Sequence, residues 1–302
     1  MKIAIPVAEF HRGNTSEYVA RALVNMGHEA TIIGAAEFGV SFQAKLHDLF
    51  FCVDSGGTFD FSQPPFANAD LSNVGFWFID YRHHADGKTR KPGDLANAKL
   101  IDRCGGRVFQ AQREDFEQCR HDGVQNVNWL PLAADPEVWT DAPAVNKIFD
   151  IGFVGNVWDR GRASALELLV NSRFFKIGFK GHGGAWKEEG AALLRQCRVG
   201  FNISSYFGTD HAFDVNMRVF ETLSCGLPII TNAVPALTKI FPRNAPYIRT
   251  FTNLEELLYV SRGAMRNEEF LSSGPAARQF ILENATYEHR MTEMLRGFPQ
   301  FT

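Results

Sequence analysis

An arginine and a glutamate lie three residues apart in the segment Asp214-Val-Asn-Met-Arg-Val-Phe-Glu221. If this segment is helical, Arg218 and Glu221 lie on one helix face near its amino end. That end carries a positive dipole and unpaired N–H groups, which favour a diphosphate. A carboxylate one turn further along can accept hydrogen bonds from both hydroxyls of a ribose. A surface ion pair on a packing helix explains the same spacing equally well.

A second group of candidates for binding phosphate follows an apolar run that ends at Val154. Gly155 and Asn156 form a turn there, and Arg160 and Arg162 come directly after it. Guanidinium groups stay charged and bind phosphate bidentately, so both arginines are candidate contacts of a diphosphate. A solvated helix start explains either arginine alone about as well.

A third candidate segment is Lys180-Gly-His-Gly-Gly184, between an apolar run and a helical pattern. Glycine permits close approach of a ligand, so Gly181 and His182 are candidates for lying beside a base. An ordinary turn is the alternative. The segment is not G-x-G-x-x-G, and Gly13, a further candidate contact, is a lone glycine in its loop. A nicotinamide-binding site therefore has little support.

Aromatic residues are numerous, with 27 phenylalanines and 5 tryptophans. Most must form the core, and Phe174 and Phe175 belong to an apolar run that we expect to be a strand buried on both faces. Tyr206 and Phe207 lie in the loop before Arg218 and are better candidates for facing a ligand.

Acidic residues and histidines follow the apolar runs of the first half. Asp54 comes after Leu49 to Val53, and Asp80 comes after Val74 to Ile79, with His83 and His84 close behind. Together with His11, they are candidates for the base that deprotonates a hydroxyl group. A structural cap or turn is the alternative explanation for each of them.

Strands and helices must position these candidates. Apolar runs cover residues 3–7, 28–33, 49–53, 74–79, 107–110, 127–130, 148–154, 174–179, 198–203 and 227–231, and segments with helical spacing lie between many of them, including 162–170, 186–196 and 217–224. This alternation predicts parallel strands with crossover helices, which is an α/β fold. The polar stretch 141–146 contains a proline and has no periodicity, so we place a domain boundary there.

The composition excludes several classes of protein. With 302 residues, 45% hydrophobic and 22% charged, the chain is typical of a globular protein. A formal net charge of -3 gives no electrostatic basis for generic nucleic-acid binding. The concentrated basic loop from Arg82 to Lys91 suits an anionic acceptor such as DNA, although a solvated loop is the simpler explanation.

Cysteine usage and the amino terminus indicate the compartment. The five cysteines form no C-x-x-C pair, so neither a disulfide framework nor a zinc site is predicted. Residues 1–7 are strand-like and lack the apolar region of a signal peptide. No apolar run approaches the length of about 18 residues that a membrane span needs. We therefore expect a cytoplasmic protein without a membrane span.

Residues Arg218 to Thr231, Arg-Val-Phe-Glu-Thr-Leu-Ser-Cys-Gly-Leu-Pro-Ile-Ile-Thr, resemble the donor-site helix of GT-B glycosyltransferases. Their R-x-F-E-x-x-x-x-G pattern resembles in particular the CgeB-like family, the spore maturation protein-like glycosyl transferases of group 1. Weaker similarities occur in the expected order: Arg12 to Glu29 with the opening of the fold, Asn128 to Asp135 with the link between domains, Asp150 to Gly155 with the first strand of the donor domain, and Thr286 to Arg290 with the C-terminal helix.

The resemblance implies two Rossmann-like doubly wound domains facing a central cleft. Residues 1–142 would bind the acceptor, and residues 143–285 would bind the nucleotide-sugar donor. Residues 286–302 would form a C-terminal helix that packs back on the N-terminal domain. Ligands in such folds bind outside the carboxyl ends of the strands.

The resemblance also implies the chemistry, which is transfer of a hexose or pentose from a nucleotide diphosphate sugar, expected to be a UDP-sugar, to an acceptor hydroxyl. Glu221 would hold the ribose, and Arg218 would contact the diphosphate or the sugar. His182 would lie in the nucleobase loop, and Asp214 and Asn216 would complete the donor site. No cofactor or metal is expected, because a helix dipole and basic side chains neutralise the diphosphate in this fold, and retention is the expected stereochemistry.

Two alternatives stay open. The related retaining enzymes carry a second glutamate eight residues before the position of Glu221, and here Phe213 stands there with Asp214 beside it. This departure favours a non-catalytic nucleotide-sugar-binding protein. The compact size and the basic loop at 82–91 suit a viral-type DNA-base glycosyltransferase acting on a hydroxylated base.

Overall fold

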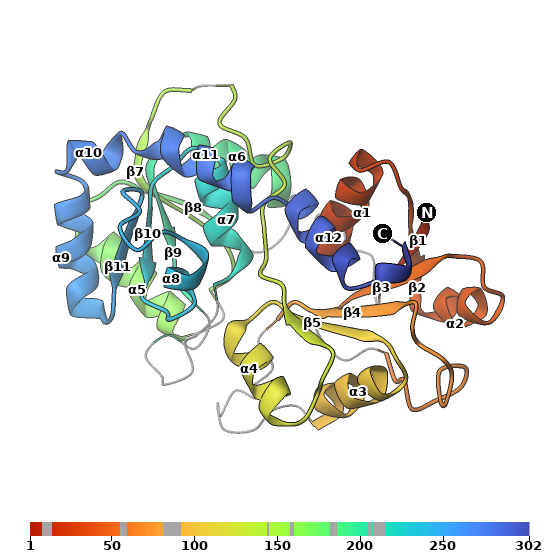
Figure 1. The fold of residues 1–302 in the computed structure, drawn as a ribbon. Helices are drawn as coiled ribbons and strands as arrows, with labels where there is room; N and C mark the ends of the chain where they lie inside the picture. The colour runs from red at the N-terminus through yellow and green to blue at the C-terminus, as the bar shows by residue number, and fades with distance from the viewer. Residues whose placement is uncertain are drawn as a thin grey trace. The chain divides into compact units, whose positions relative to one another are not determined.

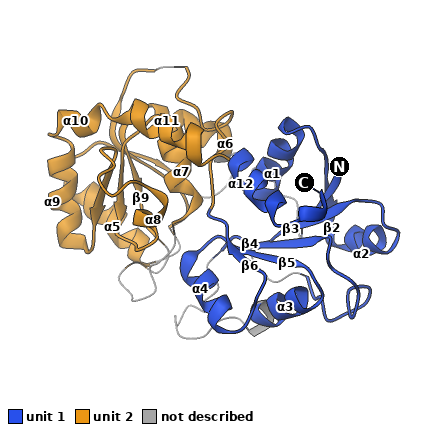
Figure 2. Cartoon of the chain, viewed as in Figure 1, with its two compact units in different colours: residues 1–131, 287–302 blue, residues 132–286 orange. Residues whose placement is uncertain are grey.

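The computed structural model describes residues 1–7, 14–54, 59–80, 92–143, 145–157, 160–181, 186–204, 207 and 215–301. The chain forms two compact units (Figure 1, Figure 2). Unit 1 comprises Met1–Pro131 and Tyr287–Thr302, and unit 2 comprises Leu132–Thr286. Unit 2 begins before the boundary expected near residue 142, because Trp139 is buried in a unit 2 cluster that includes Val154 and Ala191.

Unit 1 contains a parallel sheet of six strands among its described residues, in the order β2-β1-β3-β4-β5-β6. The strands are β1 (Lys2–Val7), β2 (Glu29–Gly34), β3 (Leu49–Asp54), β4 (Val74–Phe78), β5 (Arg107–Gln110) and β6 (Val127–Trp129). The helices are α1 (Thr15–Asn25), α2 (Ala35–Gln43), α3 (Pro92–Arg103), α4 (Arg113–His121), α12 (Tyr287–Arg296) and the 3-10 turn η1 (Pro299–Phe301). The apolar runs of the first half are therefore confirmed as strands.

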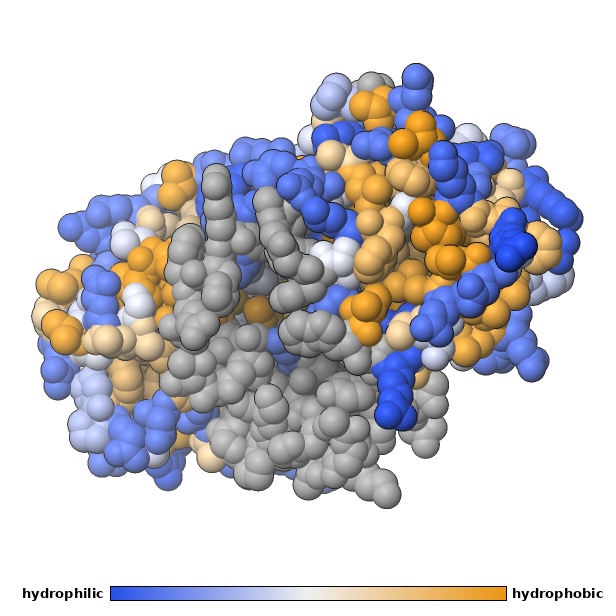
Figure 3. Space-filling view, turned by 180° about the vertical axis from the view of Figure 1, so that it is seen from behind, coloured by the Kyte–Doolittle hydropathy of each residue, from blue (hydrophilic) through white to orange (hydrophobic). Residues whose placement is uncertain are grey.

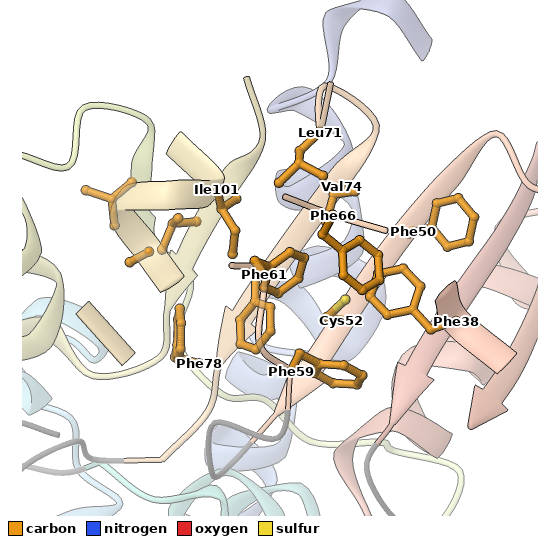
Figure 4. Packing of buried hydrophobic residues seen from close by; sticks show 14 of the residues in the cluster. Phe38, Phe50, Cys52, Phe59, Phe61, Phe66, Leu71, Val74, Phe78 and Ile101 are labelled. Carbon is orange, nitrogen blue, oxygen red and sulfur yellow. The ribbon is translucent and has the colours of Figure 1, made fainter. Parts of the chain in front are cut away.

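Helices cover both faces of this sheet. Consecutive strand residues point to opposite faces, so neighbouring residues of one strand contact different helices. Phe50 packs against Phe38 of α2, with ring centroids 5.4 Å apart, in an aromatic cluster shown in Figure 4. The neighbouring residue Phe51 stacks instead on Trp77, which contacts Tyr287 of α12. The C-terminal helix α12 thus belongs to unit 1 and forms part of its core.

Unit 2 repeats this arrangement, and the part of it that the structure describes contains a five-stranded parallel sheet in the order β11-β10-β9-β7-β8. The strands are β7 (Phe149–Val154), β8 (Ile177–Lys180), β9 (Cys197–Asn202), β10 (Ile229–Asn232) and β11 (Ile248–Phe251). The helices are α5 (Arg160–Asn171), α6 (Trp186–Arg195), α7 (Met217–Ser224), α8 (Leu237–Ile240), α9 (Leu254–Ala264), α10 (Glu268–Leu271) and α11 (Gly274–Asn284).

The two faces of the unit 2 sheet are also covered separately. Ile151 and Phe153 of β7 pack in a cluster that includes Leu169 of α5. Val154 packs instead with Ala191 of α6 and with Trp139. The predicted α/β fold with two Rossmann-like doubly wound units is therefore confirmed.

The strand order places a topological switch point in each unit, where the chain order of the strands reverses. In unit 1 this point lies between β1 and β3, and in unit 2 it lies between β7 and β9. Open parallel sheets bind ligands beside the carboxyl ends of the strands at such points. In unit 2 the turn at Gly155 and the residues after Asn202 leave the sheet there.

Both ends of α1 carry residues that favour helix termini. Asn14 caps α1, since its side chain accepts a hydrogen bond from the Glu17 amide at 3.3 Å. Gly27 follows α1 with a φ of 85°, a left-handed conformation that glycine adopts without a steric penalty.

The prediction of a buried strand that includes Phe174 and Phe175 was wrong. The strand β8 begins only at Ile177, because Arg173 turns the chain with a φ of 56°. The Phe174 side chain is consequently 56% exposed. It is one of the exposed large hydrophobic side chains of unit 2. The face of the molecule in Figure 3 mixes hydrophobic and hydrophilic residues.

Candidate functional site

Helix α7 has the bounds that its sequence pattern predicted, and both of its ends are built by local contacts. Asn216 caps the amino end, since its side chain accepts a hydrogen bond from the Arg218 amide at 3.1 Å. Gly226 follows the carboxyl end with a φ of 67°. Between them, Phe220 and Leu223 are fully buried and fix the rotation of the helix. That rotation decides where Arg218 and Glu221 lie.

Arg218 and Glu221 form an ion pair on this helix, as their spacing predicted. The Arg218 side chain is 15% exposed and that of Glu221 only 1%. The Arg218 guanidinium also lies over the Trp139 ring, 5.0 Å from its centroid. The pair is therefore buried and held by an aromatic contact, unlike the solvated surface pair that was its alternative explanation.

One oxygen of the Glu221 carboxylate is orphaned. Oε2 accepts from Arg218, whereas Oε1 is buried and has no hydrogen-bond partner among the residues that the structure describes. Burial raises the pKa of Glu221 to about 7, against the lowering effect of Arg218. Asp135 adds a smaller repulsion that raises this pKa further. A buried acceptor without a donor is costly, and hydroxyl groups of a ligand would satisfy it.

Hydrogen bonds connect three predicted residues at the unit 2 switch point. Arg162 donates through Nε to the carbonyl of Ile203, just after β9, at 3.1 Å, and through Nη1 to Oδ1 of Asn156 at 3.1 Å. The side-chain amide of Asn216 donates to the same Ile203 carbonyl at 3.5 Å. These bonds link the turn after β7, the end of β9 and the start of α7. Arg162 thus joins the turn after β7 to the end of β9, and Asn216 joins the end of β9 to the start of α7.

Other predicted residues lie at or just beyond the ends of strands, or at the start of a helix. Gly155 accompanies Asn156 in the turn, where a Cβ atom would approach Phe153 to 3.1 Å. Arg160 is exposed at the start of α5, and Gly181 follows β8. In unit 1, Asp54 is the last residue of β3 and Asp80 is exposed beyond β4.

The remaining predicted residues lie outside the residues that the structure describes. They are His11, Gly13, His83, His84, His182, Tyr206 and Asp214. Their proposed roles therefore rest on the sequence alone.

Sequence reasoning missed Trp139 and Arg278. The Trp139 carbonyl accepts from the Ser224 hydroxyl at 2.5 Å, so Trp139 is tied to the last turn of α7 as well as to Arg218. Arg278 of α11 donates to the Ser224 carbonyl and pairs with Asp141 at 3.2 Å. A tryptophan beside the segment Asn128 to Asp135 was the available signal for the first of them, whereas nothing in the sequence connects Arg278 with α7.

Polar residues at the carboxyl ends of β9 and β10 were also missed. Asn202 donates to the Thr231 hydroxyl at 3.0 Å, and Asn232 accepts from the Ser204 amide at 2.7 Å. All four side chains are buried. Buried polar pairs of this kind fix the backbone at which the β9 loop starts. Polar residues closing apolar strands were the available signal.

Replacing Asn216 with alanine should lower the free energy of unfolding by about 1 kcal/mol, because α7 loses its side-chain cap. Serine at this position should restore most of the loss. Asn253 is a matched control, since it caps α9 by accepting from the Glu256 amide at 2.9 Å. Urea unfolding of the Asn216→Ala, Asn216→Ser and Asn253→Ala variants gives the comparison. A loss in Asn253→Ala without any loss in Asn216→Ala would contradict the assignment of the α7 cap.

Two observations concern metals and membranes. In the described ranges, no group of three histidine, cysteine, aspartate or glutamate side chains is arranged to hold a metal ion. No helix in the same ranges has the length and apolarity needed to cross a membrane.

Comparison with known proteins places the chain in a family. A family model described as glycosyl transferase-like matches residues 142–296, which is just over half of the 302 residues. The match includes the Arg218–Glu221 pair and the turn at Gly155. No curated protein sequence matches the chain significantly.

Several solved structures share the fold of the whole chain. Sucrose-phosphate synthase from Thermosynechococcus elongatus has a TM-score of 0.68 at 12% identity, covering 99% of this chain and 98% of the other. HepE of Anabaena, in complex with UDP and glucose, has a TM-score of 0.65 at 11% identity, with 98% and 99% covered. An alpha-glucosyltransferase in complex with UDP-glucose and DNA containing an abasic site has a TM-score of 0.62 at 10% identity, with 99% of each chain covered. These similarities establish a GT-B fold.

Proposed function

We propose that this chain, which belongs to the glycosyl transferase-like family, transfers a sugar from a UDP-sugar to an acceptor hydroxyl. The family and the GT-B fold support a glycosyltransferase. Two proteins with this fold were solved with UDP and glucose or with UDP-glucose, which supports uracil as the base of the donor. We further propose a CgeB-like enzyme that retains the configuration at the anomeric carbon and uses no metal.

The observation that carries the proposal is the buried Arg218–Glu221 pair at the amino end of α7, next to the unit 2 switch point. We assign Glu221 to the ribose, because its orphaned Oε1 is an acceptor for hydroxyl donors. We assign Arg218 to the diphosphate or the sugar. The amino end of α7 supplies a positive dipole to the same region.

The arginines after β7 take different roles in this proposal. Arg162 is engaged with Ile203 and Asn156, so we assign it to holding the turn after β7 and the end of β9 in place. Arg160 is exposed and is assigned to the leaving diphosphate. Stabilising the charge that develops on that group is the chief electrostatic task of the site. Gly155 and Gly181 permit close approach of the nucleotide, and His182, Tyr206 and Asp214 are proposed contacts on the basis of the sequence.

We propose that unit 1 binds the acceptor. In a retaining transfer the leaving phosphate takes the proton of the acceptor hydroxyl, so no side chain has to act as the base. In an inverting transfer Asp54, Asp80 or His83 would do so. We also propose that the enzyme works in the cytoplasm, in agreement with five cysteines that are all free.

Release of UDP tests the proposal. The full chain should release UDP from at least one of a panel of UDP-sugars, and faster with a hydroxyl-bearing acceptor. Binding of UDP-sugars without release under any condition would instead make the chain a non-catalytic nucleotide-sugar-binding protein. Absence of both binding and release would overturn the proposal.

A second panel tests the viral-type alternative, which the structural similarity to an alpha-glucosyltransferase in complex with DNA favours. Transfer to duplex DNA with a hydroxylated base, with binding that weakens steeply as salt rises, would identify DNA as the acceptor. Transfer to small hydroxyl acceptors, without any binding of DNA at low salt, would exclude DNA as the acceptor.

A further inference from the structure

A pocket opens on unit 2 at the edge of the sheet where its strands begin. Its volume is about 300 Å³, and its lining includes Asp150, Phe174, Arg198, Arg262 and Arg266. We call it the amino-edge pocket. Asp150 and Arg198 are the second residues of β7 and β9, whereas the candidate donor site lies beyond the carboxyl ends of these strands. A six-residue strand spans roughly 20 Å, so the two sites are separate.

The amino-edge pocket carries excess positive charge. Asp150 is the one carboxylate in its lining, against three arginines. It pairs with Arg198 at 3.7 Å and accepts from the Lys176 amide at 2.8 Å. Neither Arg262 nor Arg266 has an ion-pair partner among the described residues. Two guanidinium groups are thus left for an anion.

An aromatic surface lies beside these charges. Phe174 is 56% exposed, and the Arg262 guanidinium lies over its ring at 4.4 Å from the centroid. The left-handed turn at Arg173 and a hydrogen bond from the Phe174 amide to the Ser172 hydroxyl, at 3.3 Å, hold the ring at the rim. Phe174 and Arg262 together present a flat apolar and cationic surface, on which a planar ring can stack.

We propose that the amino-edge pocket binds a nucleoside phosphate. The guanidinium groups of Arg262 and Arg266 match the oxygens of a phosphate group, which arginine binds bidentately. Phe174 offers its surface to the base. A volume of about 300 Å³ is at the lower end of the range for small-molecule sites and suits a single nucleotide. This site is independent of the donor site and of the proposed transfer reaction.

Calorimetry of the full chain with ATP and with inorganic pyrophosphate tests the proposal. The Arg262→Ala/Arg266→Ala double variant should bind ATP at least about tenfold more weakly than the wild type. Phe174→Ala should weaken ATP binding and leave pyrophosphate binding unchanged, because only ATP has a base to stack. Arg243→Ala is the matched control, since Arg243 is an exposed arginine of unit 2 that does not line the pocket.

The donor-site variant Glu221→Ala separates the two sites. Its affinity for ATP should equal that of the wild type, whatever the outcome of the UDP-release assay. No ATP binding by the wild type, equal binding by the double variant, or loss of binding in Glu221→Ala would each overturn the proposal. The thermal unfolding midpoint of each variant shows whether it is folded. If the double variant does not fold, the single variant Arg266→Gln takes its place in the comparison.

Discussion

Replacing Glu221 with alanine should raise the dissociation constants of UDP and UDP-glucose by about 10- to 100-fold. The proposed site uses this carboxylate to accept hydrogen bonds from the ribose, and a hydrogen bond to a charged group contributes about 1.5–3 kcal/mol. The fold should survive, since the substitution removes a buried carboxylate with one orphaned oxygen. Isothermal titration calorimetry of the two ligands measures the effect.

The ribose itself supplies a sharper test of the same contact. The wild type should bind 2′-deoxy-UDP more weakly than UDP, whereas Glu221→Ala should bind both with equal affinity, because the partner of the missing hydroxyl is gone. Glu167 is exposed on α5, so Glu167→Ala is the matched control and should behave as the wild type does. Equal affinities of wild type and Glu221→Ala for UDP would remove Glu221 from the donor site.

The architecture and the central helix of the candidate site could be predicted because both depend on local patterns. Alternating apolar runs and helical spacings define a parallel α/β fold, and an apolar face with Phe220 and Leu223 defines α7. The three-residue spacing of Arg218 and Glu221 then places them on one face. The fold class and this ion pair were therefore accessible without any structure.

Contacts between distant segments could not be predicted. Trp139 and Arg218 are separated by 78 intervening residues, and they are in contact only because the chain folds α7 against the start of unit 2. Arg162 has the residue type that suits a phosphate, yet its guanidinium binds the Ile203 carbonyl. The prediction that Phe174 is buried failed for a similar reason. The turn at Arg173 exposes the Phe174 side chain, and a hydropathy pattern does not predict that turn.

The pKa of a buried carboxyl group is a second property that only the structure supplies. For Glu221 it leads to a prediction about the free energy of unfolding. Burial raises the pKa of Glu221 from 4.5 to about 7, so the folded protein holds this proton more tightly than the unfolded chain does. Unfolding then releases a proton between about pH 4.5 and 7, and the free energy of unfolding falls as the pH rises through that window. At 1.36 kcal/mol per pKa unit, Glu221 alone accounts for a fall of about 3 kcal/mol.

The Glu221→Gln variant isolates this effect, because glutamine has nearly the same shape and does not titrate. Relative to the wild type, the variant should gain about 3 kcal/mol of stability between pH 4.5 and pH 7.5. Urea unfolding at intervals of half a pH unit measures both profiles, provided that the denaturant slopes agree. Glu167→Gln should give a profile parallel to that of the wild type, since Glu167 is exposed. Parallel profiles for Glu221→Gln as well would mean that Glu221 ionises at its ordinary pKa, and that Arg218 balances the cost of burying its charge.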